Sequence, residues 1–197
     1  MKILYSCINA RAEYWCERVF APDSDFEALM RQNHVPLYAL ESLEPIADFD
    51  FIGFTLGYEL CYTNILNMLD LAGVEIMQKD RGESIFPIVC AGGSCCCNPE
   101  PIADFIDLFF LGEGEELDLE VMDLYTEMKE KGATRSEFLR AAAQIEGVYV
   151  PSLYDVTYND DGTVASVTPR DGAPARVRKR IIEDFDACYY PTKPIVP

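Results

Sequence analysis

Three consecutive cysteines, Cys95 to Cys97, stand in the segment AGGSCCCNPEP at positions 91–101. Thiolates bind metals and act as nucleophiles. Cluster and zinc sites separate paired thiols by two or more residues, and adjacent side chains on an extended segment point to opposite sides. At most one or two of the three could therefore share a metal. The other ligands would have to come from distant cysteines, namely Cys7, Cys16, Cys61 or Cys188.

Three interpretations of the triplet stay open, and small neutral loop filler is favoured over the other two. A helix beginning just after the loop could lower the pKa of one thiol and make it reactive. Metal ligation is the third interpretation. If one of the three matters, we expect it to be Cys95. The sequence predicts no metal site in this chain. His34 is the single histidine and stands in a different segment, so no Cys–His–Asp arrangement supports a hydrolytic or redox enzyme.

Glycines mark three strand ends where a ligand could be held. They stand in TLGYE (55–59), AGGSC (91–95) and LGEGEE (111–116). Glycine lets backbone approach a ligand closely, and ligands of open parallel sheets bind beyond the carboxyl ends of the strands. Tight turns also need glycine, so each loop alone has a structural explanation. The candidate ligand-binding residues are Gly57, Tyr58, Glu59, Gly92, Gly93, Cys95, Asn98, Glu100, Gly112, Glu113 and Gly114.

The third loop does not predict a phosphate site. A P-loop needs Lys and Ser/Thr after its glycines, whereas this loop offers Glu113, Glu115 and Glu116. Carboxylates at a helix start favour the helix dipole, which makes capping the simpler role. The alternative is that one of them accepts hydrogen bonds from a ligand hydroxyl or amide.

The elements that would position these loops alternate between strand and helix. Buried strands are predicted at 48–56, 86–92 and 106–111, each a continuous apolar run. Helices are predicted at 1–15, where a strand is the rival, and at 23–33, 58–72, 98–105, 115–131 and 134–146. A short strand is expected at 17–22, and Ser24 with Glu27 suggests a capping box. This pattern predicts a doubly wound α/β fold with a mostly parallel sheet, and we expect residues 1–146 to form that domain.

The alternation of strands and helices stops after Gly147. Residues 147–169 read as two strands around the turn NDDG, a β-hairpin. Residues 170–197 are rich in proline and charge, contain RVRKR, and read as a linker to something else.

Charge and hydropathy narrow the class of protein. The net charge is −18 over 197 residues, so direct binding of nucleic acid is not expected. No apolar run approaches the roughly 20 residues of a membrane span, and no signal peptide is evident, so a cytoplasmic protein is predicted.

Several strings together resemble a known family. FDFIGFTLGYELCYTNILNMLDLAG (49–73), AGGSCCCNPEPIADFIDLFFLGEGEE (91–116) and the closing PIVP look like the N-terminal, cobalamin-binding-like (Rossmann-like) region of uncharacterised radical SAM proteins. The resemblance covers nearly the whole chain. It implies that a radical SAM barrel follows this region in such proteins, holding a [4Fe–4S] cluster through C-x-x-x-C-x-x-C and binding S-adenosylmethionine.

The departures from that family limit what this chain does alone. It contains no C-x-x-x-C-x-x-C, so the catalytic barrel with its cluster and S-adenosylmethionine is expected elsewhere. It also lacks D-x-H-x-x-G, so cobalamin is not an expected cofactor. The resemblance further suggests a first strand missing before residue 1. Such a gap would expose a sheet edge, and pairing with a second copy could cover it, which suggests a homodimer.

The sequence thus predicts an accessory, non-catalytic domain whose partner is the radical SAM barrel of the same protein. In that role the three glycine loops would cover or shape the substrate or cofactor site. The alternative is a free-standing domain that binds cobalamin or a nucleotide at the same edge.

Overall fold

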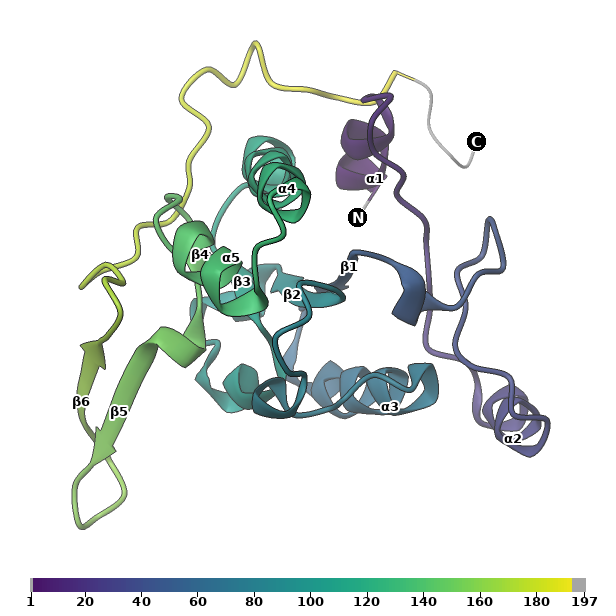
Figure 1. The fold of residues 1–197 in the computed structure, drawn as a ribbon, viewed down its shortest axis with the longest axis horizontal. Helices are drawn as coiled ribbons and strands as arrows, with labels where there is room; N and C mark the ends of the chain where they lie inside the picture. Colours follow the sequence, from purple (N-terminus) through teal and green to yellow (C-terminus); the bar gives the residue numbers. More distant parts are fainter. Residues whose placement is uncertain (1, 193–197) are drawn as a thin grey trace.

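The computed structural model describes residues 2–192 and has the predicted α/β architecture (Figure 1). Four strands form the main sheet in the order β1 (Phe51–Thr55), β2 (Ile88–Gly92), β3 (Leu108–Phe110) and β4 (Val148–Tyr149). The first three strands are parallel, and β4 pairs antiparallel with β3. A mostly parallel sheet with a separate C-terminal hairpin confirms the predicted fold class.

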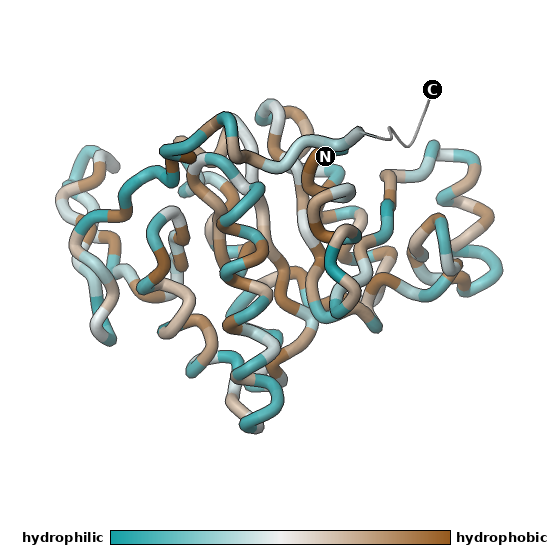
Figure 2. The backbone as a smooth tube through the Cα atoms, turned by 90° about the horizontal axis from the view of Figure 1, so that it is seen from above, coloured by the Kyte–Doolittle hydropathy of each residue, from teal (hydrophilic) through white to brown (hydrophobic). Residues whose placement is uncertain are grey.

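Helices cover both faces of this sheet. On one face α3 (Tyr62–Ala72) packs through Ile65 and Leu69 against alternate strand residues such as Ile52 and Phe54. On the other face α4 (Gly114–Glu130) and α5 (Arg135–Ala142) enclose a second cluster around Leu108. Figure 2 shows hydrophobic segments concentrated in the middle of the molecule, with hydrophilic stretches in the peripheral loops.

Local sequence signals explain how several helices begin and end. The Thr134 hydroxyl accepts a hydrogen bond from the Glu137 amide, and the Glu137 carboxylate accepts one from the Thr134 amide, so α5 starts in the predicted cap as a full capping box. Gly73, in the left-handed conformation at φ +70°, ends α3 as its sequence predicts.

The N-terminal region departs from the prediction in three ways. Helix α1 (Lys2–Asn9) is shorter than expected, because the Asn9 side chain accepts from and donates to the backbone of Cys16 and closes a loop there. Helix α2 (Ser24–Gln32) begins without a capping box, since the Glu27 carboxylate binds Arg31 and Asn67 instead. Residues 17–22 form no strand; the backbone bond found there joins the Leu40 amide to the Arg18 carbonyl.

The predicted hairpin begins later than residue 147. Val148 and Tyr149 join the main sheet, since Leu111 donates a backbone bond to Gly147 and positions that segment beside β3. The hairpin itself consists of β5 (Tyr154–Tyr158) and β6 (Val164–Pro169) and carries a bulge near Tyr158.

A buried ionic cluster joins the amino-terminal ends of the strands to α5. Asp107 is fully buried, and its Oδ2 accepts hydrogen bonds from the Val89 amide at 2.7 Å, Arg135 at 2.9 Å and Arg81 at 3.0 Å. Both arginine side chains are almost completely buried as well. The cluster lies at the end of the sheet opposite the glycine loops and has a structural role.

Over residues 2–192, the structure contains no helix that is both long and apolar enough to cross a membrane.

Candidate functional site

Two of the three predicted glycine loops meet at the carboxyl edge of the sheet. The Cys95 amide donates to the Leu56 carbonyl at 3.1 Å, and the Ser94 hydroxyl donates to the Gly57 carbonyl at 3.1 Å. Gly93 makes this contact possible, because a Cβ there would lie 2.6 Å from the Leu56 carbonyl oxygen. The close approach that glycine permits is therefore between two loops of the same chain.

This pair of loops presents several predicted site residues to solvent. Gly57, Tyr58 and Glu59 are exposed after β1, and Asn98 is exposed after the cysteine turn. Leu60, which the sequence did not single out, has 83% of its surface exposed. The edge is thus an open surface with apolar and acidic groups, and its ligand-binding role stays a prediction.

The cysteine triplet forms a short 3₁₀ turn at Ser94–Cys97, and its three side chains lie in different environments. Cys96 is buried in the core beneath β1 and β2, where burial raises the pKa of its thiol to about 12. Burial and the nearby Glu59 carboxylate raise the pKa of Cys95 as well. Cys97 is exposed. The three thiols therefore do not share one environment, and a thiolate activated by a lowered pKa is not supported at Cys95 or Cys96.

No three cysteine, histidine or acidic side chains among residues 2–192 converge in a way that could hold a metal ion.

The predicted residue Glu100 serves a structural contact. Its carboxylate accepts a hydrogen bond from the Tyr149 hydroxyl at 2.5 Å, which ties the 3₁₀ helix Glu100–Phe105 to β4. Burial and this carboxylate raise the pKa of Tyr149 above its ordinary range.

The third glycine loop is covered by the C-terminal tail. Gly112 has φ +119°, and a Cβ there would lie 2.2 Å from the Arg180 carbonyl oxygen. Arg180 donates its amide to the Leu111 carbonyl at 2.8 Å, and the Glu113 carboxylate accepts from the Ile182 amide at 2.5 Å. Gly112 and Glu113 therefore bind the chain's own tail in this structure.

Up to residue 192, the tail is packed against the domain, whereas the sequence predicted a linker at residues 170–197. Ile182 is buried, and Arg180 forms an ion pair with Glu120 at 3.0 Å on α4. Farther along, the Tyr189 hydroxyl lies 2.6 Å from the Ser6 hydroxyl on α1. Figure 1 shows the tail, in yellow, passing over α4 toward α1. Residues 193–197, with the PIVP motif, lie outside the described residues.

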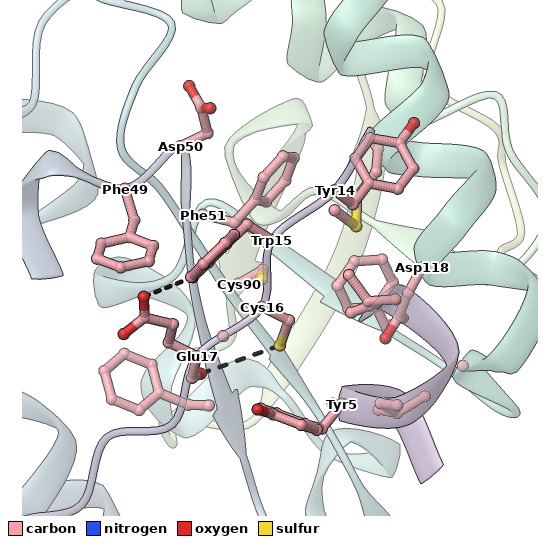
Figure 3. A pocket seen from close by; sticks show the side chains of 18 of the residues that line it. Tyr5, Tyr14, Trp15, Cys16, Glu17, Phe49, Asp50, Phe51, Cys90 and Asp118 are labelled. Atoms are coloured by element: carbon pink, nitrogen blue, oxygen red, sulfur yellow. Dashed lines mark hydrogen bonds between the residues drawn. The ribbon is translucent and has the colours of Figure 1, made fainter. Parts of the chain in front are cut away.

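A deep groove that the sequence analysis missed lies beside β1, with a volume of about 1460 Å³. Its floor includes Gly53 and Gly92, while α4 forms one wall and residues 13–19 form the other. Figure 3 shows Trp15 and Glu17, which are joined by a hydrogen bond, on that second wall, with Phe49 and Phe51 also lining the groove. A glycine in the middle of an apolar strand is the signal that could have indicated it, because such a glycine often marks a close approach by another group.

Asp118 lines this groove at its α4 wall. Its Oδ1 is buried and accepts no hydrogen bond from any residue of 2–192. Burial and the neighbouring Glu115 carboxylate raise the pKa of Asp118 to about 7. The carboxyl group is therefore partly protonated at neutral pH. Gly114, the last predicted site residue, begins α4 directly against this side chain: a Cβ there would lie 3.0 Å from an Asp118 carboxylate oxygen.

Comparison with known proteins now places the chain in a family. The family model described as "Radical SAM proteins, N-terminal" matches residues 1–151. The chain belongs to this family. An uncharacterized protein of Methanocaldococcus jannaschii is 34% identical over 144 residues, which are 73% of this chain and 29% of that relative. The chain thus spans less than a third of the length of the curated relative it matches. No solved structure matches the chain.

The match confirms the resemblance on which the sequence analysis relied. In this chain the matched region folds into a Rossmann-like domain with a mostly parallel sheet, and the glycine loops lie at its carboxyl edge. Cobalamin binding does not follow from it, because the likeness to cobalamin-binding domains is one of fold.

Proposed function

We propose that this chain is an accessory N-terminal domain of a radical SAM enzyme, whose carboxyl sheet edge covers the mouth of a following barrel. In this proposal the barrel holds the [4Fe–4S] cluster and S-adenosylmethionine, and the domain's loops help to shape the substrate or cofactor site. The family match supports the N-terminal position. The covering role rests on the docked tail.

The tail supports the proposal through the path of its described residues. It is anchored at the carboxyl end of β3 through Arg180 and Ile182 and then reaches α1 through Tyr189. A domain that continues from such a tail would start on the side of the sheet where the loops after β1 and β2 are exposed.

Exposed apolar side chains on this loop and on the tail support the same orientation. A partner domain can cover large apolar side chains that are exposed in the isolated domain. Each of these side chains has 60% or more of its surface exposed: Tyr58, Leu60, Ile181, Phe185 and Tyr190.

The test uses a polypeptide that joins residues 1–197 to a radical SAM barrel with its cluster reconstituted. Leu60→Asp places a charge on the loop after β1, and Leu29→Asp, on the exposed side of α2, is the matched control. We expect Leu60→Asp to accelerate removal of cluster iron by a chelator several-fold, because the barrel mouth is uncovered, and Leu29→Asp to leave the rate unchanged. Equal rates for both variants and the unaltered protein would refute the covering role.

A second measurement separates this proposal from a free-standing binding domain. Residues 1–197 are incubated with cobalamin and desalted, and the visible spectrum is recorded. The accessory role predicts that no colour remains, while stoichiometric retained colour would favour the binding domain.

A further inference from the structure

The outer edge of β1 has backbone groups that no other strand of residues 2–192 pairs with. β1 pairs with β2 alone, and in parallel pairs alternate residues of a strand bond to the neighbour. The Ile88 amide bonds the Asp50 carbonyl, and the Leu56 amide bonds the Gly92 carbonyl, so the even-numbered residues face β2. The amides and carbonyls of Phe51, Gly53 and Thr55 therefore point outward.

The groove adjoins this edge and extends over the face of β1 and β2 on which α4 packs, since its lining includes Cys90 and Gly92 of β2. Gly53 and Thr55 are exposed although they stand in the middle and at the end of a strand of a parallel sheet, where both faces are normally covered. A Cβ at Gly53 would meet only the Cys90 sulfur, at 3.6 Å, so the strand has room above it. The opposite wall, residues 13–19, runs without strand pairing.

The acidic lining of the groove favours a basic occupant over an acidic one. Nine acidic and three basic side chains line it, and only Asp118 among the acidic ones has its pKa raised to about 7. A second copy of this chain, with a net charge of −18, would be repelled at such a rim. Phosphate-bearing ligands would be repelled for the same reason. A polypeptide with basic side chains is attracted, and only a polypeptide also satisfies a row of unpaired backbone groups.

We propose that this groove accepts an extended polypeptide segment that adds a strand to the outer edge of β1, with apolar side chains alternating with basic ones. On the proposed function, which places this chain in a longer protein, the segment belongs to the part of that protein outside residues 1–197; the matched region makes up only 29% of the Methanocaldococcus relative. Its basic side chains face the carboxylates of the groove, and its backbone bonds to Phe51, Gly53 and Thr55.

The hairpin is the competing edge, and its geometry disfavours it. β5 and β6 also have unpaired sides, but the bulge at Tyr158 bends and twists the pair. The groove described above draws its lining from residues 2–130, so neither β5 nor β6 borders it.

The first test uses a synthetic probe, the peptide acetyl-(Lys-Val)₃-amide, with residue-resolved hydrogen exchange. We expect the amides of Phe51, Gly53 and Thr55 to exchange at least tenfold more slowly with the peptide than without it. The emission of Trp15, the only tryptophan and a groove residue, should change over the same peptide concentrations. An acetyl-(Glu-Val)₃-amide peptide should do neither.

Two variants decide whether the edge itself is used. Gly53→Pro removes the backbone amide of residue 53, which faces outward, so the hydrogen bonds between β1 and β2 stay intact. Gly53→Ala keeps this amide and is the control. We expect Pro to abolish peptide protection and Ala to retain it, with circular dichroism verifying that both fold. If the Gly53→Pro variant does not fold, the (Lys-Val)₃ peptide is methylated on its backbone nitrogens. This removes the hydrogen-bond donors of the peptide instead of that of β1, and the methylated peptide should fail to bind.

Several results would overturn the proposal. They are unchanged exchange at β1, protection of β5 or β6 instead, equal binding of the acidic peptide, and a dimer mass by light scattering with β1 already protected. In a longer polypeptide that contains this domain, the three amides should be protected without added peptide; rapid exchange there would also refute it.

Discussion

Replacing Asp107 with asparagine should destabilise the domain strongly. Asp107→Asn keeps the shape of the side chain and removes its charge. The two guanidinium groups that it neutralises, on Arg81 and Arg135, are 2% and 4% exposed and bond to the same oxygen, Oδ2. The substitution leaves both cations buried without a counter-charge.

The magnitude follows from what a buried ion pair loses when one partner is removed. Breaking such a pair costs about 3–5 kcal/mol, because the remaining charge is desolvated and unpaired. The Val89 amide also loses an ionised acceptor at 2.7 Å, and hydrogen bonds to charged groups contribute about 1.5–3 kcal/mol. These terms overlap, so a total loss of about 4 kcal/mol is expected. Domains are stable by about 5–15 kcal/mol, so the loss is a large fraction.

Urea unfolding followed by circular dichroism measures this effect. The midpoint should fall strongly while the dependence of the free energy on urea stays constant, since the surface exposed on unfolding is the same. Asp104→Asn, three residues earlier and exposed, is the matched control and should change stability by less than about 0.5 kcal/mol. A loss below about 1 kcal/mol for Asp107→Asn would refute the reasoning. Replacing Arg81 with methionine in that variant should restore part of the loss, because one stranded cation is then removed.

Three further changes test other parts of the structure. Thr134→Ala removes one half of the capping box of α5 and should lower the free energy of unfolding by about 1 kcal/mol, measured in urea. Asp118 is protonated more readily in the folded state than in the unfolded chain, so stability should fall as pH rises from about 4 to about 7, and Asp118→Asn should flatten that part of the pH profile of the melting temperature. Gly112→Ala forces a Cβ against Arg180 and should release the tail, so trypsin should cut within 176–180 several-fold faster; Gly162→Ala, also at positive φ but with open space around it, should leave cleavage unchanged.

The sequence contained enough information for the sheet and its helices because those signals are local. Apolar runs of strand length gave β1, β2 and β3, and the amphipathic pattern with Thr134 gave α5. The meeting of the loops after β1 and β2 also followed, since carboxyl ends of adjacent parallel strands share an edge. These inferences needed only the chain's own periodicity and its order of elements.

The inferences that failed concern contacts between segments far apart in sequence. The strand predicted at residues 17–22 had suitable residues but lacks a strand partner in the described chain. Val148 and Tyr149 looked like part of the hairpin, yet Gly147 pairs them with β3. The tail around Arg180 has the composition of a linker, and its docking depends on Leu111 and Glu113, about 70 residues earlier. Composition cannot reveal such partners.

The glycines of this sheet therefore serve different structural purposes. Gly93 allows two loops to touch, Gly112 allows the tail to cross β3, and both would place a Cβ within 2.6 Å of a backbone oxygen. Gly53 is different, because a Cβ there meets nothing closer than 3.6 Å. The first two glycines are explained by contacts that the structure already contains. Gly53, in the middle of β1, instead has open space above the sheet, where the groove lies. For that reason it, rather than the glycine-rich loops at the strand ends, points to an occupant beyond these residues.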